Sequence, residues 1–313
     1  MLVVHFLDVG GGDCTIIEFP YYENPNTQQR LLLGDRILKY RVGMMDINIA
    51  DGYTHPIKYL FERVQTRNLF RFILTHPHMD HLFGLEDLVK NVNITNFWDI
   101  NHNFEPDKSS DDWEKYRPHW LQYLKLKESI DRPRYLNNFK RWKDQCDFLV
   151  QDGISVLSPT PELEQSAMEN TDDNQRVHKA CFVLKISYAG KSIILGSDAD
   201  YECWEDIYQH YKNNLSFLKA DILKASHHGH ESGYHKEAVT AIAPSYVIIS
   251  DGKKTDSDYS DVYKNEHNAT VLATWERKNY VLSIKENGDI EPKHNEKGKL
   301  QTGDLVASAT GRR

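Results

Sequence analysis

The sequence has few of the features that mark secreted, membrane-spanning or nucleotide-binding proteins. Its 313 residues include four cysteines, which are far apart and form no Cys-x-x-Cys pair, so we expect reduced thiols and a cytoplasmic location. No apolar run approaches the roughly 18 residues of a membrane helix, and the first residues lack the basic region and long apolar core of a signal peptide. The glycine triplet at positions 10–12 is followed by no Lys-Ser or Lys-Thr pair, and no Gly-x-Ser-x-Gly elbow occurs. Neither a nucleotide-binding phosphate loop nor serine hydrolase chemistry is therefore expected.

Positive charge is scarce relative to negative charge. The 38 Lys and Arg residues face 46 Asp and Glu residues, which gives a formal net charge of -8. We therefore expect no non-specific attachment to duplex DNA or to an anionic membrane, and a small or single-stranded anionic substrate fits this balance better. A hydrophobic fraction of 40% with 27% charged residues is typical of a chain that folds around a packed core.

Strand-like and helix-like patterns alternate along most of the chain. Helical spacing of apolar residues predicts helices at 57–64 and 85–92. This alternation indicates a layered α/β architecture rather than a helical bundle or an all-β sandwich. Apolar and β-branched runs predict strands at 2–7, 14–19, 71–75, 181–186, 192–195, 222–225, 246–249, 271–274 and 280–284.

The stretch 101–175 departs from this rhythm, and we interpret it as an insertion that decorates the core. Its residues 113–148 are rich in aromatics at helical spacing, whereas residues 159–173 are acidic and loop-like. Residues 1–100 and 176–297 would then form the two halves of one fold, and residues 298–313 a polar tail.

Cations in this insertion are interleaved with aromatic residues, a composition typical of surfaces that track phosphates and stack bases. A solvated basic helix face is the alternative. Because long insertions in compact domains are usually lids or binding elements, we expect this one to place an anionic substrate, or else to mediate self-association or binding of a protein partner. The candidate substrate-binding residues are Arg132, Arg134, Lys140 and Arg141.

Histidine is concentrated in two places: seven of the 15 histidines lie at 75–81 and 226–235. The first window reads His-x-His-x-Asp-His directly after an apolar strand. Imidazole and carboxylate are the usual ligands of a hydrolytic Zn²⁺, Mn²⁺ or Fe ion. His76 and His78 can converge on one ion, while Asp80 and His81 can serve a second. The pattern predicts a metal centre rather than a merely polar loop.

Two further segments extend this pattern. His-Phe-Leu-Asp-Val-Gly begins at position 5 and is followed by Gly12 and Asp13, and Asp-Ile-Leu-Lys-Ala-Ser-His-His-Gly begins at position 221. Together with the histidine window, these segments resemble the metallo-β-lactamase-fold hydrolases, and especially the subgroup related to the hydrolase domain of the ComEC DNA-uptake protein. The resemblance spans most of the chain outside the insertion. It implies an αββα sandwich, with two mixed sheets face to face and the site at the loop edge where the histidine windows meet.

The resemblance also implies a ligand set for two divalent ions, with Zn²⁺ as the expected metal and Mn²⁺ or Fe as alternatives. A carboxylate can bridge ions about 3.5–4 Å apart. The implied ligands are His76 and His78 for the first ion, Asp80, His81 and His227 for the second, and Asp198 as the bridge. His178, just before the strand predicted at 181–186, is a candidate third ligand of the first ion, and without it the first ion would be held less tightly than the second.

Three residues have implied roles beyond coordination. Asp46 would accept a hydrogen bond and so orient a ligand histidine. Asp80 would also orient the attacking hydroxide, and His228 would contact a substrate oxyanion or protonate the leaving group.

The expected function is that of a metal-dependent hydrolase in which a metal-bound hydroxide attacks the substrate. The favoured substrate is a phosphodiester in a nucleotide, a single-stranded nucleic acid or another small molecule, which would make the enzyme a phosphodiesterase or nuclease. One alternative is a hydrolase of a lactam, lactone or thioester. Others are a binding or sensor protein with weak catalysis and an effector that acts with a partner, although the complete ligand set disfavours an inactive scaffold.

Overall fold

The computed structural model describes residues 1–20, 32–33, 36–37, 40–141, 147–169, 173–277 and 279–295 of the chain. These residues form two large β-sheets, and a short ribbon of β3 (Leu32–Leu33) and β4 (Arg36–Ile37) lies apart from them. The polar tail expected at 298–313 lies outside the described residues.

The first sheet has eight strands and mixes parallel with antiparallel pairs. β1 lies between β15 and β2, and every pair from β16 to β5 is antiparallel. The pairs from β5 to β8 are parallel. In spatial order the strands are β16 (Ile290–Asn295), β15 (Asn279–Ile284), β1 (Leu2–Phe6), β2 (Thr15–Pro20), β5 (Tyr40–Met45), β6 (Asn68–Ile73), β7 (Asn93–Trp98) and β8 (Arg134–Leu136).

The second sheet has six strands. β9, β10 and β11 pair antiparallel, whereas β11 to β14 run parallel. In spatial order the strands are β14 (Thr270–Ala273), β13 (Tyr246–Ile249), β12 (Ile222–Lys224), β11 (Lys191–Leu195), β10 (Val183–Tyr188) and β9 (Ile154–Ser158).

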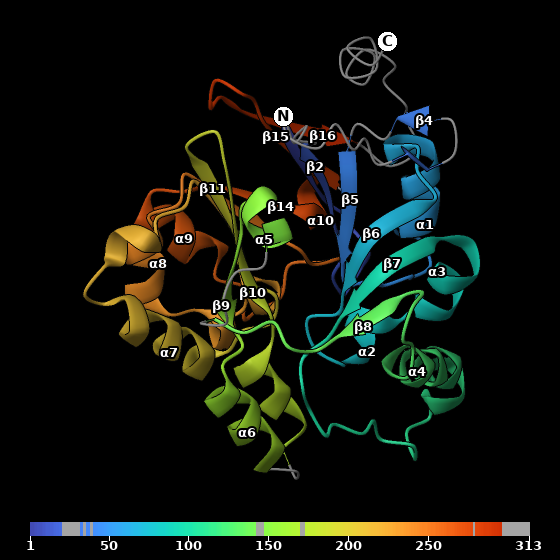
Figure 1. The fold of residues 1–313 in the computed structure, drawn as a ribbon. Helices are drawn as coiled ribbons and strands as arrows, with labels where there is room; N and C mark the ends of the chain where they lie inside the picture. Colours follow the sequence, from blue (N-terminus) through green and yellow to red (C-terminus); the bar gives the residue numbers. More distant parts are fainter. Residues whose placement is uncertain are drawn as a thin grey trace.

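Three hydrophobic cores separate four layers. The central core joins the facing sides of both sheets, with Phe6 and Ile17 from the first sheet and Leu184 and Leu195 from the second. The outer cores pack helices on the other side of each sheet (Figure 1). The αββα sandwich expected from the sequence is therefore confirmed. On the first sheet the covering helices are α1 (Pro56–Tyr59), α3 (Leu85–Asn91) and α4 (Trp113–Lys127), and on the second α7 (Tyr201–Tyr211), α8 (Lys236–Ile242) and α9 (Ser260–His267).

Burial on both faces explains why the strands appear as continuous apolar runs in the sequence. Successive strand residues point to opposite faces, so Ile17 enters the central core while Ile16 enters the outer one. Phe72 and Ile73 divide between the two cores in the same way. The nine strands expected from the sequence are all present, with ends that differ by a few residues.

The stretch 101–175 is more closely built into the fold than an insertion that decorates it. β8 extends the first sheet and β9 forms the edge of the second. The helical pattern of residues 113–148 is only partly realised, since α4 ends at Lys127 and residues 134–136 form strand β8. Residues 142–146 lie outside the described residues. The expected loop at 159–173 contains helix α6 (Pro161–Glu169), whose first residue is a proline, as is common at helix starts.

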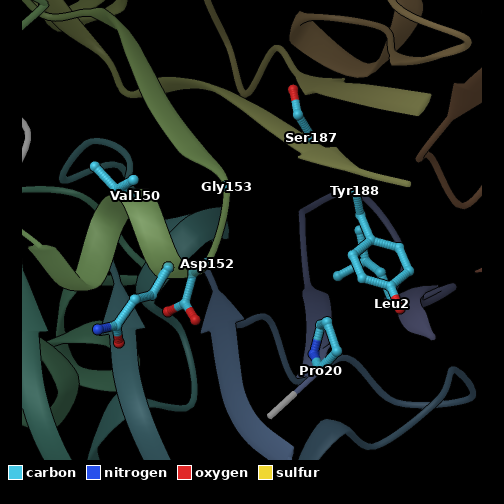
Figure 2. A pocket seen from close by; sticks show the side chains of 8 residues that line it. Leu2, Pro20, Val150, Asp152, Gly153, Ser187 and Tyr188 are labelled. Atoms are coloured by element: carbon cyan, nitrogen blue, oxygen red, sulfur yellow. The ribbon is translucent and has the colours of Figure 1, made fainter. Parts of the chain in front are cut away.

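The two ends of the sandwich differ. One end carries a cavity of about 260 Å³ lined by Leu2, Pro20, Gly153 and Tyr188, among others (Figure 2). Strand register places this cavity away from the histidine windows, because Pro20 pairs with Tyr40 at the start of β5, whereas the first histidine window follows the end of β6. None of the helices in the described part of the chain is both long and apolar enough to cross a lipid bilayer.

Candidate metal centre

Four loops bring the candidate ligands together at the other end of the sandwich. Asp46 follows β5, and the window at 75–81 follows β6, its parallel neighbour in the first sheet. Asp198 follows β11, and the window at 226–235 follows β12, its parallel neighbour in the second sheet. Because parallel strands end at the same edge of a sheet, each pair of loops emerges side by side.

Three imidazoles form a first ligand group. The Nδ1 atom of His78 lies 3.1 Å from Nε2 of His76 and 2.9 Å from Nε2 of His178. The other ring nitrogen of His78, Nε2, lies 2.8 Å from the carbonyl oxygen of Asn174 and can donate to it. That bond leaves the Nδ1 lone pair of His78 facing the other two histidines. The structure therefore brings His178, the candidate third ligand, beside His76 and His78.

A second ligand group combines two carboxylates and two histidines. Nε2 of His81 lies 3.3 Å from Asp198 and 3.6 Å from Asp80. Nε2 of His228 lies 3.5 Å from Asp80 and 3.6 Å from Asp198. Asp198 also lies 4.0 Å from Nε2 of His76 in the first group. Its carboxylate is thus positioned between the two groups, as expected for a bridge.

The arrangement differs from the expected one at two adjacent histidines. His228, and not His227, joins Asp80 and His81 in the second group. His227 instead lies beside His178 and Asp198, with its ring centre 4.7 Å from that of His178. His228 donates from Nδ1 to the carbonyl oxygen of Ser250 at 2.8 Å, which directs Nε2 toward the carboxylates.

Left-handed backbone conformations cluster at these loops. Non-glycine residues rarely adopt a positive φ, and such residues concentrate at functional sites. Asp46 has a φ of 60°, Ser197 of 49°, His227 of 49° and His228 of 56°. Two consecutive left-handed residues reverse the chain direction at once, which explains how the neighbouring imidazoles of His227 and His228 come to face different groups.

Asp46 is hydrogen-bonded to His81. Its Oδ2 lies 2.8 Å from Nδ1 of His81 and accepts a hydrogen bond from the Thr75 hydroxyl, while its Oδ1 accepts from the Thr75 backbone N–H. The carboxylate therefore holds the ring so that Nε2 of His81 points into the second group.

Two buried polar atoms test whether this donor set fits a cation. Within the described part of the chain, neither Nε2 of His81 nor Oδ1 of Asp198 has a hydrogen-bond partner. Side-chain exposure is 0% for His81 and 3% for Asp198, and buried polar atoms are normally bonded. Both atoms face other ligand-type atoms, and imidazole with carboxylate is a donor set that Zn²⁺ and related ions accept. The residues present therefore fit divalent metal ions.

Burial controls the protonation of the first group. It lowers the pKa of His76 well below its ordinary value and that of His178 to about 3. It also lowers the pKa of His78. These rings are therefore neutral at neutral pH, the form that offers a lone pair to a metal.

The second group has the opposite electrostatics. Burial alone would lower the pKa of both histidines, but the nearby carboxylates override it, led by that of Asp198. The pKa of His228 rises to about 10, and that of His81 rises well above its ordinary value. Positive charge is thus favoured between Asp80 and Asp198, and a divalent cation can supply it in place of the two protons.

Two of the four proposed substrate-binding cations pair with carboxylates that belong to neither ligand group. Lys140 forms an ion pair with Glu164, and Arg141 forms one with Asp206. These pairs hold both cations in the fold. Two exposed cations of the same segment remain as candidates, namely Arg132 and Arg134.

Sequence reasoning gave no role to two charged residues near the centre. Asp13 offers a carboxylate oxygen within 4.8 Å of ligand-type atoms of Asp46 and His81, and it forms a buried ion pair with Lys224. Both residues lie in the motifs quoted for the resemblance, but neither stands next to a histidine of the first window, so spacing alone gave no indication of their place.

The chain is similar to known proteins in part of its sequence and in its overall structure. No family model matches the chain. ComE operon protein 3 of Bacillus subtilis is 28% identical over 136 residues, which are 44% of this chain but 15% of that protein. The metallo-β-lactamase fold protein YhfI of Bacillus subtilis has a TM-score of 0.48 at 11% identity, and Igni18, a metallo hydrolase of Ignicoccus hospitalis, has a TM-score of 0.46 at 12% identity. Each of these two comparisons covers 94% of this chain and 100% of the other.

Proposed function

We propose that this chain is a metal-dependent hydrolase that binds two divalent ions, with Zn²⁺ as the resident metal. The observation that carries the proposal is the placement of Asp198, whose buried carboxylate lies within 4.0 Å of histidine nitrogens in both ligand groups. A shared carboxylate of this kind suits a pair of ions rather than one isolated ion. Resemblance to the metallo-β-lactamase-fold hydrolases in the histidine windows supports the same assignment.

The residues of the two ligand groups would have different roles in metal binding and in the reaction. His76, His78 and His178 would hold the first ion, and the second group would hold the other. When bound, paired divalent ions lower the pKa of a coordinated water and polarise the electrophilic centre of the substrate. Asp80, whose side chain is 40% exposed, is the carboxylate best placed to orient that water.

Asp46 would keep His81 aligned through its bond to Nδ1. His228 has two candidate roles, as a ligand through Nε2 or as the proton donor to the leaving group. Its place between Asp80 and Asp198 favours the ligand role.

The substrate class that we propose is a phosphodiester in a nucleotide, a single-stranded nucleic acid or a small molecule. The net charge of -8 favours such substrates over bulk duplex DNA. The resemblance of the sequence motifs to the ComEC-related subgroup supports a phosphodiester. Exposed Arg132 and Arg134 are the cations through which residues 101–175 would contact an anionic substrate.

Metal analysis combined with a substrate panel tests the proposal. We expect close to two equivalents of Zn²⁺ after reconstitution, and hydrolysis of bis-p-nitrophenyl phosphate, of cyclic nucleotides or of labelled single strands that chelation abolishes. A lactam, a lactone and a thioester serve as comparison substrates, and turnover confined to these would overturn the phosphodiester assignment. Absence of Zn, Mn, Fe, Co and Ni even after reconstitution would overturn the hydrolase assignment itself.

A further inference from the structure

A buried ion pair connects the two sheets beside the second ligand group. Nζ of Lys224 lies 2.5 Å from Oδ2 of Asp13, and each side chain is 3% exposed. Asp13 lies in the turn between β1 and β2 of the first sheet, and Lys224 is the last residue of β12 in the second. The pair therefore links one half of the sandwich to the other.

On the first sheet, Asp13 of this pair contacts the backbone of Asp80. The backbone N–H of Asp13 donates to the carbonyl oxygen of Asp80 at 3.3 Å. The preceding residue, Gly12, lies so close that a Cβ atom there would be 2.5 Å from the same oxygen. The turn before β2 is thus pressed against the loop that carries Asp80 and His81.

On the second sheet, Lys224 of this pair is connected to the loops that carry Asp198 and His228. The carbonyl oxygen of Lys224 accepts a hydrogen bond from the backbone N–H of Gly196, two residues before Asp198. Only three residues separate Lys224 from His228. Any movement of Lys224 relative to Asp13 would therefore change the spacing between Asp80 and the pair formed by Asp198 and His228.

We propose that Asp13 and Lys224 are a positioning pair for the second ligand group, acting through the backbone of Asp80 on one side and the loops of Asp198 and His228 on the other. This inference rests on the proposed function, because it assumes that the second group binds an ion. A buried ion pair is weak evidence for stability, and its location at the centre points to geometric control. The pair also gives a role to the glycine-rich opening motif, to which the resemblance assigned no ligand.

The test replaces both charges at once, in the variant Asp13→Asn/Lys224→Met. Removing one partner alone would leave an uncompensated buried charge, whereas removing both often leaves a protein folded. Zn²⁺ binding to the metal-depleted protein is followed by competition with a chromophoric chelator, which gives an affinity for each equivalent. We expect the second equivalent to bind about 10- to 100-fold more weakly, the range for groups that orient metal ligands, while affinity for the first stays near that of the wild type.

Two further variants make the result specific. Arg41→Met removes a cation from the ion pair with Asp152 at the opposite end of the sandwich and is expected to leave both affinities unchanged. Gly12→Ala adds a methyl group against the Asp80 carbonyl without altering any charge, and is expected to weaken the second equivalent selectively. It provides an independent test if the double variant does not fold.

The outcomes separate this inference from the function beneath it. A wild-type protein that takes up no second ion would overturn the proposed pair of ions, and this inference with it. A wild type that binds two ions, with folded variants at Asp13, Lys224 and Gly12 that bind the second ion equally well, would overturn the positioning role alone. Equal weakening in Arg41→Met would do the same, because the effect would then be a general response to lost charge.

Discussion

At one end of the sandwich, buried charges neutralise one another within the protein, whereas at the other end they gather around a common centre. The Asp152 carboxylate, which is 0% exposed, forms ion pairs with both Arg41 and Arg71. Arg41 and Arg71 belong to the first sheet, and Asp152 lies two residues before the start of β9 in the second. This cluster is built as a structural connection between the layers.

The carboxylate at the opposite end is similarly buried, but its neighbours are histidines rather than arginines. The Asp198 carboxylate is 3% exposed, and four histidine nitrogens lie 3.3–4.0 Å from it. Its Oδ1 atom has no hydrogen-bond partner anywhere in the described ranges. Since buried carboxylates are normally satisfied by donors or cations, the comparison shows that burial alone does not identify a functional carboxylate. Asp198 differs from Asp152 in having one carboxylate oxygen without a hydrogen-bond partner and in having histidines rather than arginines around it.

The variant Asp198→Asn should have the largest effect and should confine it to activity. Loss of the shared anionic oxygen would weaken both ligand groups, so we expect turnover to fall at least about a thousandfold, as when one member of a cooperative site is removed. Unfolding of the metal-depleted variant should remain cooperative in urea. Near-normal kcat with normal metal content would show that Asp198 is not the bridge.

The variant Asp152→Asn should have the converse effect, on stability and not on activity. Breaking a buried ion pair on one side typically costs about 3 kcal/mol or more, and here two arginines lose their carboxylate partner. Because the metal centre lies at the other end of the strands, metal content and kcat/KM should stay within about twofold of the wild type. Urea denaturation and elemental analysis on one preparation measure both, and loss of metal in this variant would mean that the two ends are not independent.

The sequence predicted the strands and the first histidine window well, because both are local signals. Strands buried on two faces are continuous apolar runs, as in β11 and β13. The window at 75–81 carries several candidate ligands within one loop, so no knowledge of distant contacts was needed to identify it. Asp198 and Asp46 were assigned their roles by resemblance. Asp198 lies between the two groups and Asp46 is hydrogen-bonded to His81, and their roles toward a metal ion stay predictions.

Sequence reasoning was less successful where the outcome depended on backbone direction or on distant partners. The division of His227 and His228 between two groups depends on a positive φ angle at each residue. Histidine as a residue type does not predict such an angle. The partners of Lys140 and Arg141 lie 24 and 65 residues away in the sequence. β8 has three residues, too few to show an alternating pattern.

The smallest expected effect is on the pH dependence of stability in the metal-depleted protein. It sharpens the contrast between the two ends of the sandwich, because the buried imidazoles that cause it lie at the end with the ligand groups. The pKa of His178 is lowered to about 3 by burial, whereas an unfolded histidine titrates near 6.5. Between these values the unfolded chain binds the proton and the native chain does not, so His178 destabilises the protein as pH falls from about 6.5 toward 3. At about 1.4 kcal/mol per pH unit, this single proton amounts to about 2 kcal/mol between pH 7 and pH 5.

The variant His178→Asn should therefore lose less stability than the wild type over that interval, by about the same amount. Urea denaturation in the presence of chelator at pH 5, 6 and 7 measures the difference. His227 is only partly buried and has a lowered pKa, so His227→Asn should change the pH dependence in the same direction but by less. His81 and His228 have raised pKa values and are protonated in both states below about pH 6.5, so they contribute above that pH instead, where their stabilisation is lost as pH rises. An identical loss of stability in His178→Asn and wild type between pH 7 and pH 5 would mean that the native chain protonates His178 as readily as the unfolded chain, and the first ligand group would then not be held neutral by burial.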